Sequence, residues 1–338
     1  MALDHLPGPT ASLPTFHRRK PNLGKLASSS LLVLAIGFII YILLRDGGKI
    51  LEQHFRFHPA ILILSFIIEC SGLLIAIPVW RKLLSCYGIH RPLRDDVSIY
   101  SYSSLALVLP GGVWNIISRS VSYQRLGESG LSVATASVVE TLIIGVAAAG
   151  LYSSITVFQP AISLWNNPWI GLLLSLLALS LLQPRIFHRV VNWILRKVNR
   201  GESFPETTFN FKDTLLWIGL EMSVLAIGGT AIFLLLASIT PISQTNIPST
   251  IISVIAAWAA GTSAGSLLFW LPGTPVLRDG AMILALAPSL SLPMAVIFVL
   301  LVRLWSLASL LFWASLVWVI MHLHSCSRPS PQPPNWVP

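Results

Sequence analysis

Two short Pro-Gly motifs interrupt apolar stretches of the chain, one in each half of the sequence. The first break is LPGGVWNIISR, from Leu109 to Arg119, and the second break is LPGTPVLRD, from Leu271 to Asp279. Proline cannot continue a helix, and glycine lets the backbone reverse direction. Such breaks, at membrane depth and in corresponding places of two half-chains, are typical of transporter binding sites. The pair therefore predicts a membrane-embedded carrier rather than a soluble enzyme.

The composition agrees with a lipid environment. Of the 338 residues, 54% are hydrophobic and only 10% are charged, whereas soluble domains carry about 25% charged residues. The net charge of +9 comes from basic clusters between apolar segments, which is typical of cytoplasmic loops and does not predict a nucleic-acid partner. Cys70, Cys86 and Cys326 share no metal-binding spacing, so we expect neither a metal site nor a disulfide framework. No cofactor motif is present either.

Hydropathy and charge together predict an all-α polytopic protein of the cell (cytoplasmic) membrane with a cytoplasmic N-terminus. The predicted elements are a tail over 1–27, spans over 28–44 and 59–79, a re-entrant hairpin over 97–126, spans over 131–152, 168–183 and 214–237, a second hairpin over 251–288, a span over 291–320, and a disordered tail over 323–338. Under this topology 17 of the 22 Lys and Arg residues are cytoplasmic, as the positive-inside rule requires. Six tryptophans are predicted at the membrane interface: Trp80, Trp114, Trp165, Trp169, Trp217 and Trp270.

The predicted membrane domain, residues 28–322, contains two inverted repeats, about 59–152 and 214–320, after an N-terminal span. Each repeat has a span with a central glutamate, a hairpin broken at Pro-Gly, and a span with one ionisable residue. Pro110 lies 30 residues before Glu140, and Pro272 lies 31 residues before Arg303. Inverted repeats place a substrate site at their interface near the midplane.

One alternative for the second hairpin stays open. Residues 251–270 are long enough to cross the membrane completely. In that case the C-terminus would lie outside and the inverted symmetry would fail.

Five short motifs are similar to those of a known family: VWRKLL, LPGGVWNIISR, ASVVE, LPGTPVLRD and VRL, which begin at Val79, Leu109, Ala136, Leu271 and Val302. Over roughly residues 26–322 the chain resembles the flippase-like membrane domain of the lysylphosphatidylglycerol synthase/flippase family. The resemblance implies a polytopic fold that moves a lipid between leaflets. The aminoacyl-transfer domain of the fused members has no counterpart after the last span, so we do not expect lipid aminoacylation or any other enzymatic activity.

The match to the family motifs is partial. The first break keeps the family's Pro-Gly-Gly and arginine, at Pro110, Gly111, Gly112 and Arg119. In the second break Thr274 replaces the second glycine, and Arg278-Asp279 stands where the family has Arg-Glu. The Glu-Arg pair of the following span is Glu140-Thr141 here. These departures bear on the substrate more than on the fold.

Charged residues at the breaks and within the spans form the predicted site. An ionisable side chain at a helix centre costs about 2.5–3.5 kcal/mol on insertion scales, so such residues normally face a cavity or one another. One interpretation is that three arginines bind an anionic head group, assisted by the helix N-termini that follow the two breaks. The predicted substrate-binding residues are Arg119, Arg278, Arg303, Asn115, Gly111, Gly112, Gly273 and Asp279.

The alternative interpretation is purely structural. Glu140 would then pair with Arg303, and Arg278 with Asp279, to hold the halves together. Glu69 and Glu221 have no basic residue within four positions, and they would either couple transport to protons or remain neutral and hydrogen-bonded. The glycines of the breaks would then let neighbouring helices approach closely, and Pro110 and Pro272 would have a structural role.

Two classes of function remain open from the sequence. The first is a carrier that moves an anionic lipid, either a phospholipid or a polyprenyl-phosphate-linked glycan, across the lipid bilayer. The second is a membrane accessory protein or enzyme of envelope glycolipid or phospholipid synthesis that binds such a lipid without moving it. Single carboxylates at midplane depth favour the carrier, since catalysis would need paired groups near one leaflet. An envelope-lipid biosynthetic enzyme and a second copy of the chain are compatible partners.

Overall fold

The computed structural model describes residues 57–108, 112–159, 176, 180, 211–241, 247–271 and 273–326. These residues form helices joined by short turns, with no β-strand among them. Several predicted features lie outside the described residues: the tail over 1–27, the span over 28–44, nearly all of the span over 168–183, the tail from residue 327, and Pro110, Gly111 and Pro272.

Five of the described helices are long and apolar enough to cross a membrane. They are α2 (Pro59–Ser85), α5 (Gly130–Phe158), α8 (Phe211–Ile239), α9 (Ile247–Leu267) and α11 (Leu292–Cys326). At 1.5 Å per residue even the shortest is about 31 Å long, which matches a hydrocarbon core of about 30 Å. The predicted all-α, multi-pass architecture is therefore confirmed.

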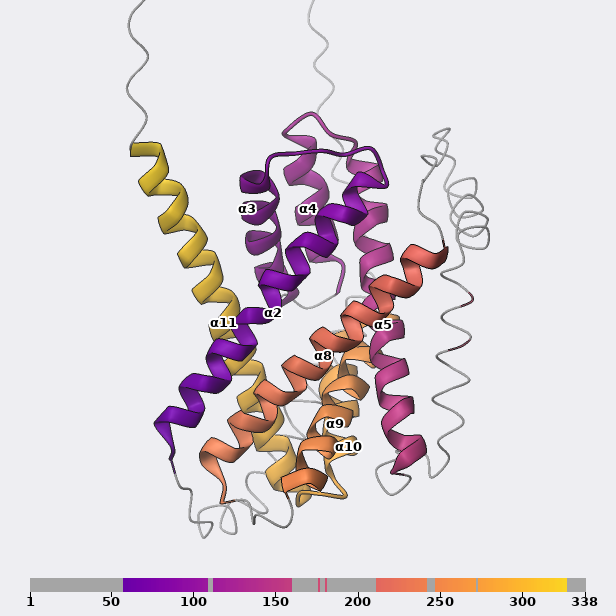
Figure 1. The fold of residues 1–338 in the computed structure, drawn as a ribbon, viewed down its shortest axis with the longest axis vertical. Helices are drawn as coiled ribbons and strands as arrows, with labels where there is room; N and C mark the ends of the chain where they lie inside the picture. The colour runs from indigo at the N-terminus through magenta and orange to yellow at the C-terminus, as the bar shows by residue number, and fades with distance from the viewer. Residues whose placement is uncertain are drawn as a thin grey trace, which may run out of the picture.

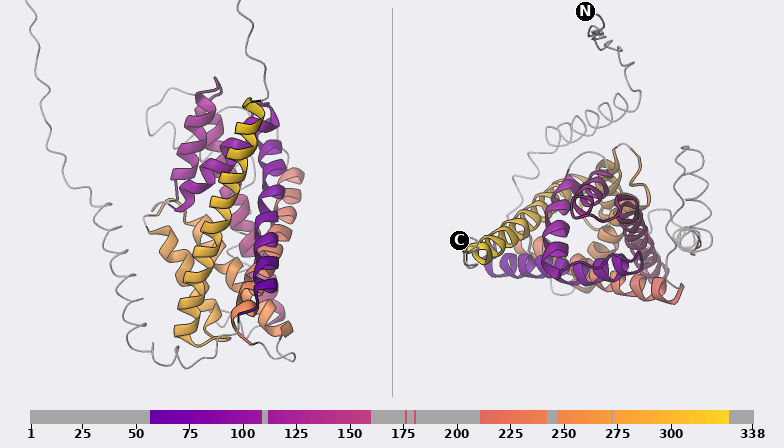
Figure 2. Two further views of the ribbon diagram at one scale, coloured as in Figure 1. Left: turned by 90° about the vertical axis from the view of Figure 1, so that its left-hand side faces the viewer. Right: turned by 90° about the horizontal axis from the view of Figure 1, so that it is seen from above.

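Both Pro-Gly breaks separate two helices, as predicted. The first lies between the 3₁₀ turn η1 (Leu105–Val108), which continues α3 (Leu93–Ser104), and α4 (Trp114–Gln124). The second lies between α9 and α10 (Thr274–Leu286). Figure 1 places α3 and α4 in the upper part of the molecule and α9 and α10 in the lower part, and the side view in Figure 2 agrees.

Helices α2 and α8 pack side by side and run in opposite directions. The backbone N–H of His58 donates to the carbonyl of Ser238 at 2.9 Å, and the hydroxyl of Ser65 donates to the carbonyl of Ala231 at 2.7 Å. As the residue number rises along α2 it therefore falls along α8. These are the first long helices of the two predicted repeats.

Helix α11 runs in the same general direction as α2 and crosses it (Figure 1). The indole of Trp305 donates to the hydroxyl of Ser65 at 3.2 Å, and that of Trp313 donates to the carbonyl of Cys70 at 2.8 Å. Phe66 packs edge-on against Trp305, with ring centroids 5.3 Å apart. These contacts fix the face of α11 that α2 covers.

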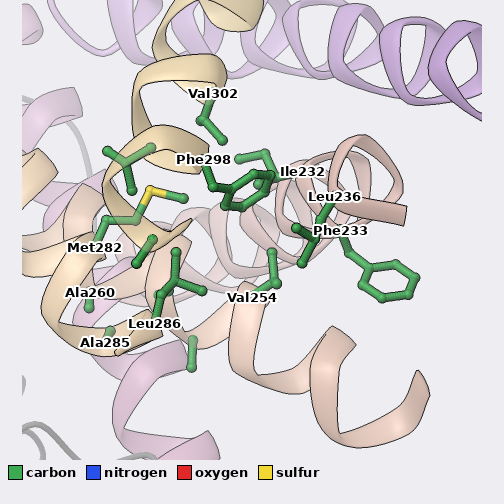
Figure 3. Packing of buried hydrophobic residues seen from close by; sticks show 14 of the residues in the cluster. Ile232, Phe233, Leu236, Val254, Ala260, Met282, Ala285, Leu286, Phe298 and Val302 are labelled. Atoms are coloured by element: carbon green, nitrogen blue, oxygen red, sulfur yellow. The ribbon is translucent and has the colours of Figure 1, made fainter. Parts of the chain in front are cut away.

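The lower core forms where α8, α9, α10 and α11 meet. Phe298, which is fully buried, lies between Met282 and Ile232 (Figure 3). Small side chains let α9 approach its neighbours closely, and a Cβ added at Gly229 of α8 would lie only 3.0 Å from the Cα of Ile255. Close approach of small residues is how membrane helices gain packing energy, because lipid supplies little hydrophobic drive between them.

Candidate functional site

The two breaks contact each other. A Cβ on Gly112, just before α4, would lie 2.8 Å from the carbonyl oxygen of Phe269, which follows α9. Since real Cβ atoms essentially never come so close to another heavy atom, this position needs glycine. Gly273 has a φ of +89°, a left-handed conformation that favours glycine. Thr274, which replaces a glycine of the family motif, lies with its hydroxyl 2.7 Å from the carbonyl of Leu271 and donates to it.

A buried ion pair joins α4 to α5. Arg119 and Glu140 have side chains only 3% and 7% exposed, and the guanidinium donates to a carboxylate oxygen of Glu140. The Nε of Arg119 donates to the hydroxyl of Ser103 at 3.1 Å. Its guanidinium also stacks on two rings, 4.5 Å from the centroid of Trp80 and 4.2 Å from that of Tyr100. We call these five residues the first charged cluster.

A hydrogen-bond chain connects the surroundings of this cluster to the end of α2. The Trp80 indole donates to the Tyr123 hydroxyl at 3.1 Å, and that hydroxyl donates to Asp96 at 2.7 Å. The Nε of Arg81 donates to the other oxygen of Asp96 at 2.8 Å. Trp80 and Trp217, two of the tryptophans predicted at the membrane interface, do not present their rings on the protein surface. Both are buried, since Trp80 stacks on a guanidinium and Trp217 packs in the same apolar core.

A second charged cluster forms where α2, α10 and α11 converge. Arg303 of α11 donates to Asp279 of α10 at 3.0 Å, and these side chains are 47% and 23% exposed. Ser306 of α11 donates to a carboxylate oxygen of Glu69 of α2 at 3.2 Å. Arg278 lies close enough to interact electrostatically with Glu69. The structure thus brings four of the predicted site residues together.

The side chain of Arg278 packs against α9. A Cβ added at Gly265 of α9 would lie 3.3 Å from the Cβ of Arg278, so this glycine makes room for the arginine stem. The guanidinium carbon lies 4.8 Å from the ring centroid of Trp258. Among the residues that the structure describes, none accepts a hydrogen bond from this guanidinium. Its planar fork of five N–H donors remains available to a ligand.

The predicted structural pairing of charges is wrong. Glu140 pairs with Arg119 and not with Arg303, and Asp279 pairs with Arg303 and not with Arg278. The reason is geometric: α4 packs on α5, and α10 packs on α11, so each partner comes from the same half of the chain. Adjacent residues of a helix, such as Arg278 and Asp279, point in different directions and do not face each other.

The remaining predicted residues differ in their surroundings. Glu221 of α8 is buried, interacts electrostatically with Glu140 and Tyr100, and forms no hydrogen bond within the described part of the chain. Asn115 of α4 is also buried, and its side-chain oxygen has no hydrogen-bond partner among the described residues. A buried side-chain atom without a partner, like the Oδ1 of Asn115, is uncommon in folded proteins and calls for an explanation.

No family model, curated protein or solved structure matches this chain. The fold and the site therefore define its class by physical features alone. It is a multi-pass α-helical membrane protein in which ionisable side chains from several helices gather in two clusters. The resemblance to the lysylphosphatidylglycerol synthase/flippase family stays a prediction.

Proposed function

We propose that this chain is an integral membrane carrier that moves an anionic lipid between leaflets, with the head group bound at the second charged cluster. The lipid is a phospholipid or a polyprenyl-phosphate-linked lipid, since both present a phosphate. In this proposal α2–α5 and α8–α11 are repeats of opposite orientation, and the helix pairs α3–α4 and α9–α10 are re-entrant hairpins.

Three observations support the repeats. Helices α2 and α8 are antiparallel, as the first helices of inverted repeats must be. The two helix pairs lie towards opposite ends of the molecule (Figures 1 and 2). In each half the helix after the break forms an ion pair with the next long helix, Arg119 with Glu140 and Asp279 with Arg303, with acid and base exchanged.

The charges of the turns support the predicted orientation. Basic residues gather in the described turns at the upper end of Figure 1 and the helix ends beside them: Arg81, Lys82, Arg91, Arg94 and Arg125. The described turn residues at the lower end, 57–58, 159, 240–241 and 287–291, contain no lysine or arginine. By the positive-inside rule the upper end is the cytoplasmic one.

The single observation that carries the proposed function is the free guanidinium of Arg278 beside the Arg303–Asp279 pair. Arg303 lies 11 residues after the start of α11, a depth of about 16 Å at 1.5 Å per residue and thus near the middle of a core of about 30 Å. Arginine at that depth is expensive unless it faces a polar path. A phosphate or carboxylate bound to these donors would offset the cost through charge-assisted hydrogen bonds.

The charges of this cluster suit reversible binding. Two arginines face two acids, Glu69 and Asp279, so the empty site is neutral when all four are ionised. An arriving phosphate competes with Asp279 for the hydrogen bonds of Arg303, whereas no described residue accepts a hydrogen bond from Arg278. The acids therefore limit affinity, which lets a carrier release its substrate. Arg119, by contrast, is enclosed by its own partners and positions α4.

The test is leaflet exchange in proteoliposomes. Wild-type protein should accelerate exchange of a fluorescent phosphatidylglycerol much more than that of a fluorescent phosphatidylcholine. A charge-assisted hydrogen bond is worth about 1.5–3 kcal/mol, so Arg278→Gln should slow phosphatidylglycerol exchange at least about tenfold. The matched control is Arg91→Gln, which removes an arginine that pairs with Asp95 and Glu128 near the basic end.

Two results would overturn the carrier proposal. Equal exchange rates for wild type and Arg278→Gln would remove Arg278 from the path. If wild-type protein gives no exchange above protein-free liposomes, yet retains an anionic lipid on purification that Arg278→Gln loses, the chain is a lipid-binding accessory protein instead.

A further inference from the structure

Glu221 is a buried glutamate whose negative charge, if ionised, no described residue balances. It is 6% exposed and lies in α8, near the first charged cluster. The one arginine of that cluster, Arg119, is already paired with Glu140. With both glutamates ionised, this buried region carries one uncompensated negative charge.

Among the described residues, none supplies a counter-charge to Glu221. The described helices that pack on α8 are α2, α5, α9 and α11, and α9 carries no ionisable side chain. The ionisable residues of the other three are Glu69, Cys70, Arg81 and Lys82 of α2, Glu140 and Tyr152 of α5, and Arg303, His322, His324 and Cys326 of α11. Within the described residues, Glu140 of α5 and Tyr100 of α3 are the ionisable groups that interact electrostatically with Glu221. Neither is a cation, and the arginines of α2 and α11 pair with Asp96 and Asp279.

We propose that Glu221 is a proton-binding site, holding an exchangeable proton that neutralises the first charged cluster. An isolated carboxylate away from water is so costly that the group takes up a proton instead. In the protonated form the carboxyl is neutral, and the ion pair of Arg119 with Glu140 is the only charged pair that remains there. The proton comes from water and returns to water, so no other reactant is needed.

Glu69, the corresponding glutamate of α2, differs from Glu221 because it has a hydrogen-bond donor and a nearby arginine. Its carboxylate accepts a hydrogen bond from Ser306 and lies within electrostatic range of Arg278. These two partners favour the ionised form of the carboxyl, whereas its burial favours the neutral form. The two glutamates looked alike in the sequence, but among the described residues Glu221 has no such partners, so the proton site is assigned to Glu221.

Loss of the proton would act on the hairpin that contains the first break. It would place a second negative charge near Glu140, and Arg119 would be the nearest described cation for two carboxylates on two helices. Arg119 is the residue through which α4 is tied to α5, so deprotonation would weaken that tie and favour a shift of α4. If the proposed carrier function holds, this coupling makes lipid exchange depend on pH.

Infrared spectroscopy of the purified protein tests the proton site without any transport. A protonated carboxyl has a C=O stretching band that a carboxylate lacks, and the band shifts in D₂O when the proton exchanges. The wild type at pH 7 should show this band, Glu221→Gln should lose a component of it, and Glu69→Gln should keep that component. The apparent Tm of Glu221→Gln should equal that of the wild type within error, because the amide resembles the neutral acid.

A band that is absent from the wild type, or unchanged in Glu221→Gln, would overturn the proton site. So would a large fall in the apparent Tm of Glu221→Gln, which would mean that the ionised carboxylate stabilises the fold. Transport is read separately: Glu221→Gln should flatten the pH profile of phosphatidylglycerol exchange. If no exchange occurs at any pH while the infrared band behaves as stated, the carrier proposal fails and the proton site stands.

Discussion

Replacing Arg119 by glutamine should destabilise the fold far more than the same replacement of Arg303, although both arginines form an ion pair at corresponding places in the two halves. The Arg119 side chain is 3% exposed and its partner Glu140 is 7% exposed, whereas Arg303 is 47% exposed. Removing one partner of a buried pair leaves the other charge without compensation. Removing Arg303 leaves a carboxylate on Asp279 that water in the proposed polar path can still solvate.

The magnitudes follow from these exposures. Breaking a buried ion pair costs about 3–5 kcal/mol, and loss of the two ring contacts of Arg119 adds about 0.5–2 kcal/mol each. Uptake of a proton by Glu140 would reduce the total, so the lower part of this range applies. The exposed pair of Arg303 with Asp279 is worth about 0–1 kcal/mol. The difference of at least about 2 kcal/mol changes the unfolding equilibrium roughly 30-fold.

The assay is unfolding of both variants in one detergent, by heat and by titration with sodium dodecyl sulfate, followed by tryptophan fluorescence. Arg119→Gln should unfold at a clearly lower temperature and detergent concentration than the wild type, and Arg303→Gln close to it. The effect on function should differ from the effect on stability. In liposomes, folded Arg303→Gln should exchange phosphatidylglycerol more slowly than the wild type, although its stability is close to that of the wild type. Equal destabilisation by the two variants would refute the assignment of Arg119 to structure and Arg303 to the substrate path.

Three further predictions concern other features. Gly112→Ala should lower stability by about 1–3 kcal/mol through overpacking against the second break. Gly72→Ala should be neutral or stabilising, because a Cβ at Gly72 has no neighbouring atom within 4 Å. Thermal unfolding distinguishes the two variants, and equal effects would argue against contact between the breaks. In a cysteine-free background, a membrane-impermeant maleimide applied to intact cells should label Ser289→Cys and leave Arg125→Cys unlabelled; the reverse pattern would invert the proposed orientation. Tyr123→Phe should cost about 1–3 kcal/mol, because it leaves buried partners of the hydroxyl unsatisfied, and an unchanged apparent Tm would contradict the hydrogen-bond chain.

Local features of the sequence were sufficient to predict the class of fold. About 20 apolar residues in a row can satisfy their backbone in lipid only as a helix, and this holds whatever the segment packs against. The breaks are local as well: α3 and η1 end at Val108 before the first Pro-Gly, and α9 ends at Leu267 before the second. The predicted positions of both interruptions were therefore confirmed without any knowledge of tertiary contacts.

The roles of the charged residues depended on contacts between segments far apart in the chain. Nothing near Glu140 in the sequence indicates that Arg119 is its partner, and the predicted partner, Arg303, lies in the other cluster. Trp80 was assigned to the interface by its place at a span end, but the ring is buried because Arg119 and Tyr123 come from another helix to meet it. The direction in which each helix face points decides such pairings.

The sequence by itself thus determined that the chain is a bundle of membrane helices, interrupted at two Pro-Gly motifs and with ionisable residues within apolar segments. Tertiary structure alone decided which of those residues are compensated. Among the described residues, Arg119 has a full set of partners, Arg278 has none for its hydrogen bonds, and Glu221 interacts electrostatically with Glu140 and Tyr100 but with no cation. The physical reason is that helix formation in lipid depends on the local chain, whereas the electrostatic state of a buried group depends on what neighbouring helices bring to within a few ångströms of it.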